Sequence, residues 1–357
     1  MPNHPETVFV TGATGFVGRY IVKHLVKGGF RVRILVRRVP QQLHDPSVEV
    51  VIGDLSQPET YAAGVDGVSA VVHSALTEDL SREPRATSAL QTLSVEMGVR
   101  KFVHLSSIVV YGNPAEGNIT EETPLILSTS VYARTKLAIE DAVRTLSGVP
   151  ETLILRLGCV YGPGGGWWSQ GLLSQMQRGK LILVNEGSGT ANLIHVSDVG
   201  ALIVLLLRRA NPALEIYNVT DGTPVTWRRY FSELEALIGR TATVSMTAAE
   251  VREHGKRWLR PSLARRAIRK ISGAELVYPM DEGGIEAFSS RAVYSNQKAS
   301  TMLGFKPEYD LTSGVRTLLD GGQQLAGIAL EKTPESTPAM KRSLRRSGLA
   351  AEDHHRA

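Results

Sequence analysis

Tyr132 and Lys136 are the pair whose residue types and spacing most directly suggest chemistry in this sequence. They stand four positions apart in a segment compatible with a helix, so both side chains share one helix face. A lysine ammonium beside a phenol favours the phenolate and lowers the tyrosine pKa from its usual value of about 10. The pair therefore predicts a general acid or base that works near neutral pH.

A strand that ends in two serines supplies a third candidate. The apolar run from Lys101 ends in Ser106 and Ser107, and Ser107 precedes Tyr132 by 25 residues. Open α/β sheets bind ligands at the carboxyl ends of their strands, and this interval lets the chain return beside the serine. A Y-x-x-x-K pair alone is common on protein surfaces. With the serine, we expect Ser107 to orient a substrate oxygen while Tyr132 delivers the proton.

A glycine-rich turn is the element that must hold a cofactor near these residues. Residues 7–18, T-V-F-V-T-G-A-T-G-F-V-G, join a β-branched run to a segment of helical periodicity. Gly12 permits a sharp turn, Gly15 lets the backbone approach a pyrophosphate, and Gly18 lets the helix pack on the strand. Phosphates bind at such a helix N-terminus because free N–H groups and the helix dipole favour anions.

Arg37 and Arg38 follow the second apolar run and bear on which cofactor is bound. About 20 residues beyond the turn, an acidic residue holds the ribose of NAD, whereas an arginine accommodates the 2′-phosphate of NADP. Arg37 stands at this place, and no carboxylate is near it in the sequence. We expect NADP, with NAD as the alternative; two solvated arginines at a strand end are the simpler interpretation.

Apolar runs alternate with helix-length segments along the first half of the chain. They cover residues 7–11, 31–36, 48–52, 68–73, 101–106 and 151–156. This alternation predicts right-handed βαβ crossovers and an α/β fold with a Rossmann-type doubly wound parallel sheet. We expect a dinucleotide-binding core over 1–160, and a segment over 161–329 that completes the sheet and forms a smaller substrate-binding lobe. A disordered tail is expected over 330–357.

Composition narrows the function classes. The lone Cys159 excludes an internal disulfide, lies in an apolar run typical of a structural thiol, and fits a reducing, cytoplasmic location. The nine histidines do not cluster with cysteines or carboxylates, so we predict no metal. A net charge of +5 favours phosphate ligands without implying nucleic acid. The apolar stretch 199–207 is far below about 18 residues and predicts a buried helix.

Several ordered motifs carry a family resemblance. They are T-G-A-T-G-F-V-G at 11–18, G-D-L at 53–55, V-V-H-S-A at 71–75, L-S-S-x-x-V-Y-G at 105–112, Y-x-x-x-K at 132–136, L-R-L-G-x-V-Y-G-P-G at 155–164, N-L-I-H-V-S-D-V at 192–199 and Y-S-x-x-K-A-x-x-x-L-G-F-x-P at 294–307. Over residues 6–320 the sequence resembles the extended short-chain dehydrogenase/reductase superfamily, in its NAD-dependent epimerase/dehydratase group.

The resemblance implies roles for individual residues. Ser107 and Tyr132 match the catalytic serine and the acid/base, and Lys136 matches the residue that holds the nicotinamide ribose and tunes the tyrosine. The expected cofactor contacts are Thr11, Gly12, Thr14, Gly15, Phe16, Val17, Arg37, Asp54, Leu55, Ser74, Ala75, Ser106, Tyr132, Lys136, Leu157 and Val160. We also expect a homodimer.

Departures from the family pattern are informative. Where N-x-x-G-T is frequent, this chain has Glu83 to Thr87, which puts the asparagine's structural or proton-relay role in doubt. Ile108 and Val109 replace the acidic pair of the 4,6-dehydratases. Ala191 replaces an arginine that clamps the diphosphate of nucleotide sugars. The N-L-I-H-V form looks more like the dihydroflavonol-reductase and 3β-hydroxysteroid-dehydrogenase-like branches.

On the substrate side we expect Ser107, Trp167, Asn192 and His195. Trp167, like Trp168 beside it, is as compatible with packing of the lobe as with lining a pocket. For His195, packing and hydrogen bonding within its loop is the alternative. Residues 261–273 predict a basic amphipathic helix; a lid with a solvated face is favoured over contact with an anionic membrane.

The function favoured by these observations is NADP-dependent oxidation or reduction of an alcohol or carbonyl in a small molecule. A nucleotide-sugar 4-epimerase with tightly bound NAD is the first alternative, and Arg228, Arg260 or Arg291 would then have to supply the missing phosphate contact. A non-catalytic NADP-sensing protein is the second alternative, against which the intact serine, tyrosine and lysine argue.

Overall fold

A seven-stranded sheet forms the centre of the computed structural model, which describes residues 6–39, 45–76, 79–127, 130–145, 148–149, 151–259 and 276–319. Its strand order is β11-β7-β5-β4-β1-β2-β3, and every neighbouring pair is parallel. The strands are β1 (Thr7–Thr11), β2 (Arg31–Val36), β3 (Val48–Ile52), β4 (Ala70–His73), β5 (Lys101–Ser107), β7 (Glu151–Leu157) and β11 (Leu214–Val219). The predicted Rossmann-type parallel sheet is confirmed.

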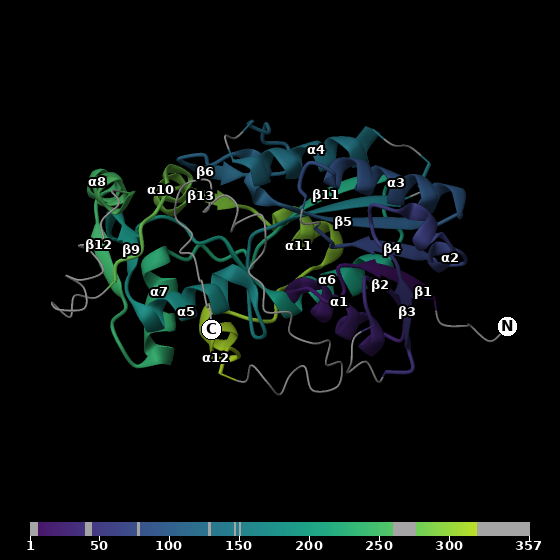
Figure 1. Cartoon of the computed structure of the whole chain (residues 1–357), viewed down its shortest axis with the longest axis horizontal. Coiled ribbons are helices and arrows are strands. Elements are labelled where there is room, and N and C mark those ends of the chain that lie inside the picture. The colour runs from purple at the N-terminus through teal and green to yellow at the C-terminus, as the bar shows by residue number, and fades with distance from the viewer. Residues whose placement is uncertain are drawn as a thin grey trace, which may run out of the picture.

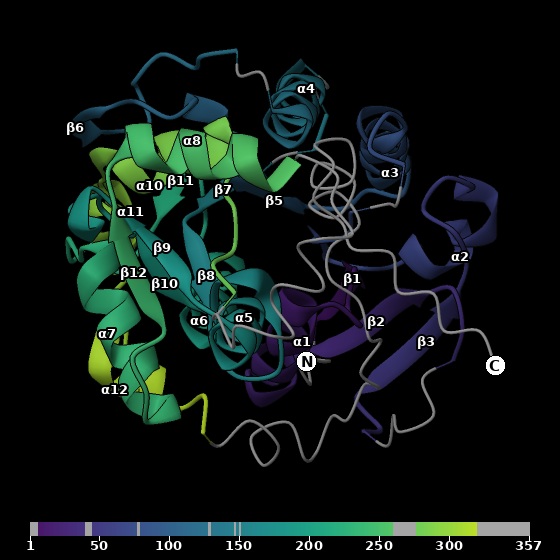
Figure 2. The same cartoon turned by 60° about the vertical axis from the view of Figure 1, so that its left-hand side comes forward.

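Helices cover both faces of the sheet (Figure 1 and Figure 2). One face carries α1 (Phe16–Lys27), α6 (Val196–Leu207) and α11 (Gln297–Leu303), and the other carries α2 (Ala62–Val65), α3 (Glu83–Glu96) and α4 (Val131–Thr145). The predicted buried helix over 199–207 is therefore part of α6.

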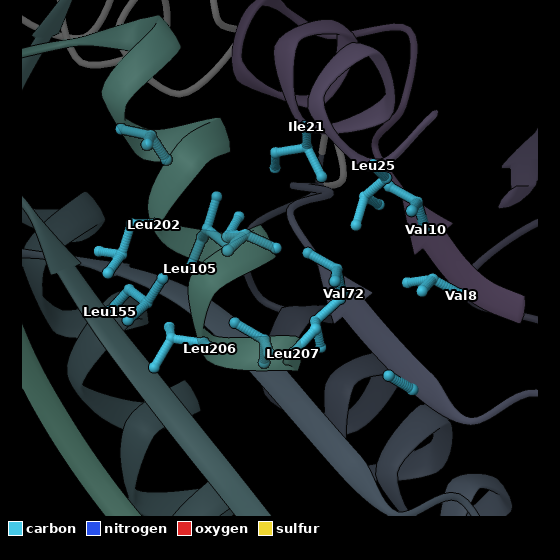
Figure 3. Packing of buried hydrophobic residues seen from close by; sticks show 14 of the residues in the cluster. Val8, Val10, Ile21, Leu25, Val72, Leu105, Leu155, Leu202, Leu206 and Leu207 are labelled. Atoms are coloured by element: carbon cyan, nitrogen blue, oxygen red, sulfur yellow. The ribbon is translucent and has the colours of Figure 1, made fainter. Parts of the chain in front are cut away.

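Strand β1 shows why its sequence is apolar throughout. Val8 and Val10 pack with α1 and α6 around Ile21 and Leu202 (Figure 3), whereas Phe9 packs on the opposite face. A strand covered on both faces has no solvent side and so reads as a continuous apolar run. The same arrangement places the carboxyl ends of β1, β4 and β5 side by side, at the edge where the site is built.

The second half of the chain adds a smaller lobe beside the sheet. Its elements are β8 (Cys159–Tyr161), the π-helical turn η3 (Gly166–Gly171), α5 (Leu172–Arg178), β9 (Leu181–Val184), η4 (Asn185–Gly187), β10 (Leu193–His195), α7 (Trp227–Ile238), β12 (Thr243–Met246), α8 (Ala248–Leu259), α10 (Glu282–Ser289), β13 (Arg291–Tyr294) and α12 (Leu311–Arg316). Short parallel pairs join β8 to β10 and β9 to β12, and β13 pairs with β6 (Glu116–Ile119). Two single turns, η1 (Pro58–Thr60) and η2 (Ile108–Tyr111), follow β3 and β5.

Two predicted segments lie outside the described residues: the basic segment 261–273 and the tail 330–357. Within the described part of the chain, no helix is both long and apolar enough to cross a membrane.

Buried histidines predict how the fold responds to acid. Burial lowers the pKa of His24 and His195 to about 4 and that of His73 to about 3. These rings are neutral in the fold but bind protons in the unfolded chain. Their contribution to the free energy of unfolding is therefore fully present above pH 6.5 and is lost as the pH falls below that value. Asp198 and Asp221, whose pKa values burial raises to about 6, act in the opposite sense between pH 4 and 6.

We expect the free energy of unfolding to fall as the pH drops from 6.5 to 4.5. Four histidines, His104 included, outweigh three carboxyls, Glu121 included. His195→Asn removes one titrating ring while keeping a side-chain acceptor at the start of α6, where His195 Nδ1 accepts from the Ser197 N–H. It should reduce that fall by about 2 kcal/mol. Urea unfolding of both proteins across this range measures the difference, and parallel pH curves would contradict the expectation.

Candidate active site

The structure brings Ser107, Tyr132 and Lys136 together at the carboxyl end of β5. Ser107 is the last residue of that strand, and its hydroxyl forms a side-chain hydrogen bond with Tyr132. Lys136, one turn further along α4, donates from Nζ to the carbonyl oxygen of Leu105 at 2.9 Å. Ser107 Oγ also accepts from the Val109 N–H at 3.4 Å. Strand β5 therefore anchors both ends of the tyrosine–lysine pair.

The electrostatics of this group differ from the sequence expectation. Burial raises the pKa of Tyr132, and only its hydrogen bond with Ser107 opposes that shift. Burial also lowers the pKa of Lys136 to about 8, against the charges of Glu83 and Glu140. The expected lowering of the tyrosine pKa by the lysine is thus wrong for the protein as described, because desolvation dominates. Tyr132 therefore stays protonated at neutral pH.

The glycine turn between β1 and α1 has the shape expected for a pyrophosphate site. Gly12 has a φ of +72°, and a Cβ there would lie 2.6 Å from the backbone nitrogen of Ala75. A Cβ on Gly18 would lie 2.0 Å from the Gly12 carbonyl oxygen. Gly15 precedes the first turn of α1, where no side chain caps the helix and no acidic residue stands. The N-terminus of α1 is therefore open to an anion, and the pyrophosphate of a dinucleotide fits the turn.

The remaining predicted contacts around this turn are also placed there. Ser74 Oγ donates to the Thr11 carbonyl oxygen at 2.7 Å, and the Ala75 N–H donates to Thr11 Oγ1 at 3.3 Å. The other predicted residues of the turn are partly exposed: Thr14, Phe16 and Val17.

Two glycine variants should separate folding from cofactor binding. Gly18→Ala should lower the free energy of unfolding by about 2 kcal/mol or more, because helix α1 must move away from the turn. Gly15→Ala has its closest contact at 3.2 Å and a φ of −73°, which alanine adopts freely, so its stability should change little. Its methyl group would instead occupy space that a pyrophosphate needs. Urea unfolding and NADPH titration of both variants test this, and equal effects on stability would contradict it.

Arg37 and Arg38 are exposed at the end of β2. The neighbouring strand β3 brings Asp54 close enough for the Arg37 charge to lower the pKa of its carboxyl, although hydrogen bonds from Ser56 lower it more. No carboxylate is near Arg37 in the sequence, but Asp54 is near it in space, because the pairing register of β2 and β3 brings the two together. Leu55 is buried in the core.

Sequence reasoning missed a buried ion pair beside the site. Arg156 on β7 and Glu140 on α4 are each 1% exposed and lie 2.7 Å apart. Ser106 Oγ donates to Glu140 Oε1 at 2.5 Å, so this predicted cofactor contact is engaged within the fold. Arg156 also donates to the Tyr111 hydroxyl at 2.7 Å. The signal for Glu140 was present: it stands four residues beyond Lys136, one further turn along the same face.

Two further predicted cofactor contacts lie on β7 and β8, three residues apart in the chain. Leu157, the last residue of β7, is buried, and Val160 in β8 is partly exposed. Cys159 is buried, and burial raises the pKa of its thiol, in keeping with the expected structural role.

The predicted substrate residues beyond Ser107 are largely engaged in packing. His195 is fully buried and its Nε2 lies 3.1 Å from Thr317 Oγ1, so the packing alternative describes it. Asn192 holds β13, donating to the Ala292 carbonyl oxygen at 3.0 Å and accepting from the Tyr294 N–H at 2.9 Å. No substrate contact for these two side chains follows from the geometry.

The tryptophans belong to the apolar core of the lobe. Trp168 stacks on Trp227 with ring centroids 5.2 Å apart, and Trp167 is partly buried against the same cluster. Trp167 thus packs within the lobe while keeping an accessible surface.

Of the arginines proposed as an alternative phosphate clamp, the two within the described residues are paired with carboxylates. Ala191 is fully buried at the position of the family arginine. Arg291 pairs with Glu116 at 2.7 Å and Arg228 with Glu186 at 3.8 Å, while Arg260 lies outside the described residues. Within the described ranges, no group of three His, Cys, Asp or Glu side chains could hold a metal ion.

Comparison with known proteins identifies the relatives. Residues 8–220 match the model of the NAD dependent epimerase/dehydratase family. A ceramide reductase of Caulobacter vibrioides is 32% identical over 222 residues, which cover 60% of this chain and 64% of that protein. A UDP-glucose 4-epimerase of Vibrio cholerae is 27% identical, with 64% and 75% covered.

Solved structures share the fold. MoeE5 in complex with UDP-glucuronic acid and NAD superposes with a TM-score of 0.66 at 24% identity, over 89% of this chain and 99% of that one. The UDP-glucuronic acid 4-epimerase of Bacillus cereus gives a TM-score of 0.68 at 20% identity, again over 89% and 99%. With the family match spanning more than half of the sequence, the chain belongs to the NAD dependent epimerase/dehydratase family, enzymes of the extended short-chain dehydrogenase/reductase type.

Proposed function

We propose that this enzyme uses NADPH to reduce the carbonyl group of a small, weakly polar molecule. The observation that carries the proposal is the grouping of Ser107, Tyr132 and Lys136 at the carboxyl end of β5. A carbonyl reduction consumes one hydride and one proton. When bound, a nicotinamide cofactor would supply the hydride to the carbonyl carbon. The Tyr132 hydroxyl gives its proton to the oxygen, so that an alcohol forms.

The chain's own residues divide the remaining work. Ser107 donates a hydrogen bond to the substrate oxygen and fixes its distance from Tyr132. Lys136, held by the Leu105 carbonyl, stands one turn behind the tyrosine. From the family resemblance we assign it the stabilisation of the phenolate that forms as the proton leaves. The Gly12–Gly15 turn fits the pyrophosphate.

The alanine at position 191, where the family's clamp arginine stands, supports a weakly polar substrate. Ala191 fills the clamp position, and the accessible part of Trp167 offers an apolar surface. Relatives named as reductases include the ceramide reductase above and a 2'-dehydrokanamycin reductase of Streptomyces kanamyceticus, 28% identical over 249 residues, with 65% of this chain and 67% of that protein covered.

A nucleotide-sugar 4-epimerase is the second candidate, favoured by the similarity to the Vibrio cholerae enzyme. The decisive assay incubates the protein with NADPH and a panel of ketones, and separately with UDP-sugars. A reductase consumes NADPH in proportion to the alcohol formed, whereas an epimerase interconverts sugars without net cofactor oxidation. Tight binding of UDP to the cofactor-saturated protein, abolished by Arg291→Ala, would overturn the reductase proposal.

Cofactor preference is tested at the end of β2. If Arg37 pairs with the 2′-phosphate, Arg37→Ala should weaken NADPH binding by about 1.5–3 kcal/mol, the range for a hydrogen bond to a charged group. NADH binding should change little, because NADH lacks that phosphate. Arg38→Ala is the matched control and should have a smaller effect. Fluorescence titration with both cofactors measures the constants, and equal losses for the two would rule out this role of Arg37.

A further inference from the structure

Lys136 is surrounded by titratable side chains from four elements. Glu83 approaches from the first turn of α3, His73 from β4, His104 from β5, and Glu140 from its own helix. Lys136 and these four side chains are all buried. Charge in such a place is costly unless an opposite charge balances it, so the protonation states within the group are coupled.

The two histidines contribute no charge near neutral pH. Their ring centroids lie 5.3 Å apart, and the ring planes are tilted by 36°. His73 is held between two hydroxyls, Thr11 Oγ1 at 2.7 Å and Thr87 Oγ1 at 3.0 Å, which suits a neutral ring. Burial and the nearby charge of Lys136 lower the pKa of both histidines, that of His73 to about 3. The balance for Lys136 must therefore come from a carboxylate.

Glu140 is already balanced by another cation. Its carboxylate accepts from Arg156 Nη2 at 2.7 Å and from Arg156 Nε at 3.1 and 3.2 Å, and Ser106 donates to it as well. This bidentate contact makes the Glu140–Arg156 pair nearly neutral as a whole. The charge that remains available to compensate the ammonium of Lys136 is the one on Glu83.

The packing of α3 on α4 keeps Glu83 in place. Gln91 Nε2 donates to the Val143 carbonyl oxygen at 3.1 Å, and the Thr87 contact with His73 fixes the first turn of α3 above β4. Glu83 is 0% exposed, and its charge raises the pKa of Lys136 more than the charge of Glu140 does. Where related sequences frequently carry a neutral asparagine, this chain has a buried glutamate whose charge acts on Lys136.

We propose that Glu83 is a positioning residue whose carboxylate keeps Lys136 in its ammonium form at neutral pH. This role rests on the proposed function in so far as Lys136 serves the reaction. Without Glu83, burial favours the neutral amine. A neutral Lys136 cannot stabilise the phenolate that Tyr132 becomes when it gives up its proton. Glu83 touches neither substrate nor cofactor in this scheme and acts only through the lysine.

The test compares Glu83→Gln and Glu83→Asn with Glu83→Asp, which keeps the charge, and with Glu96→Gln, an exposed glutamate at the other end of the same helix. The first readout is the pH profile of kcat. Deprotonation of Lys136 sets its basic limb, which should move down by about one pH unit or more in the two neutral variants. The limb should stay in place in Glu83→Asp and Glu96→Gln. An unmoved limb in the neutral variants overturns the proposal.

The second readout is independent of activity. With a folded pKa of about 8 for Lys136, below the unfolded value of 10.5, the wild-type stability rises with pH between these values. In the neutral variants the rise in the free energy of unfolding should begin at a lower pH. A plot of that free energy against pH, measured by urea unfolding, should then gain a positive slope between pH 6.5 and 8. Folding of those variants only above pH 8 supports the same conclusion. An unchanged slope refutes the charge balance, whereas a changed slope without turnover on any ketone refutes only the proposed function.

Discussion

Tyr132→Phe is expected to lower turnover about 10²- to 10⁴-fold while leaving cofactor affinity and stability nearly unchanged. The phenol hydroxyl is the proton donor held at Ser107, and burial keeps it protonated through neutral pH. Phenylalanine preserves the ring and its packing and removes only the oxygen. Without that donor, hydride transfer to the carbonyl would leave an unprotonated alkoxide, which the site cannot neutralise quickly.

Single-turnover rates with saturating NADPH and ketone measure this loss directly, and NADPH titration shows whether the cofactor still binds. Ser107→Ala serves as the graded comparison. It removes one hydrogen bond to the substrate oxygen but leaves the proton donor, so its loss should be smaller than that of Tyr132→Phe. Turnover near the wild-type rate in Tyr132→Phe would remove Tyr132 from the mechanism.

The parts of the site that were predictable from sequence are those encoded locally. The glycine turn lies in consecutive residues, and a Cβ on Gly18 would collide with the backbone of Gly12 in the same turn. The Tyr132–Lys136 pair follows from helix periodicity. Both signals need no knowledge of distant packing.

The parts that were not predictable depend on strand register and burial. Asp54 reaches the neighbourhood of Arg37 only because β2 and β3 pair in one particular register. The raised pKa of Tyr132 reflects desolvation, which a spacing rule cannot supply. The packing of His195 against Thr317 joins segments 122 residues apart in the sequence. Such features arise from tertiary contacts, which composition and periodicity do not contain.

The pair Glu140–Arg156 should give the largest stability effect of any single contact described above. Glu140→Leu alone, or Arg156→Met alone, should lower the free energy of unfolding by about 3–5 kcal/mol, because each leaves the partner charge buried and uncompensated. The double variant should recover much of that loss, since it removes both charges. Recovery stays incomplete because Ser106 and Tyr111 lose their hydrogen-bond partners.

A double-mutant cycle by urea unfolding gives the coupling energy directly. The exposed pair Arg291–Glu116 has the same 2.7 Å separation, but its side chains are 66% and 68% exposed, so the same cycle there should yield less than about 1 kcal/mol. Equal coupling in the two cycles would mean that separation alone, and not burial, sets the strength of these pairs. Because Ser106 ties Glu140 to the residue before Ser107, loss of the pair should also slow turnover. That loss should exceed what the stability change alone explains, since the end of β5 would no longer be held against α4.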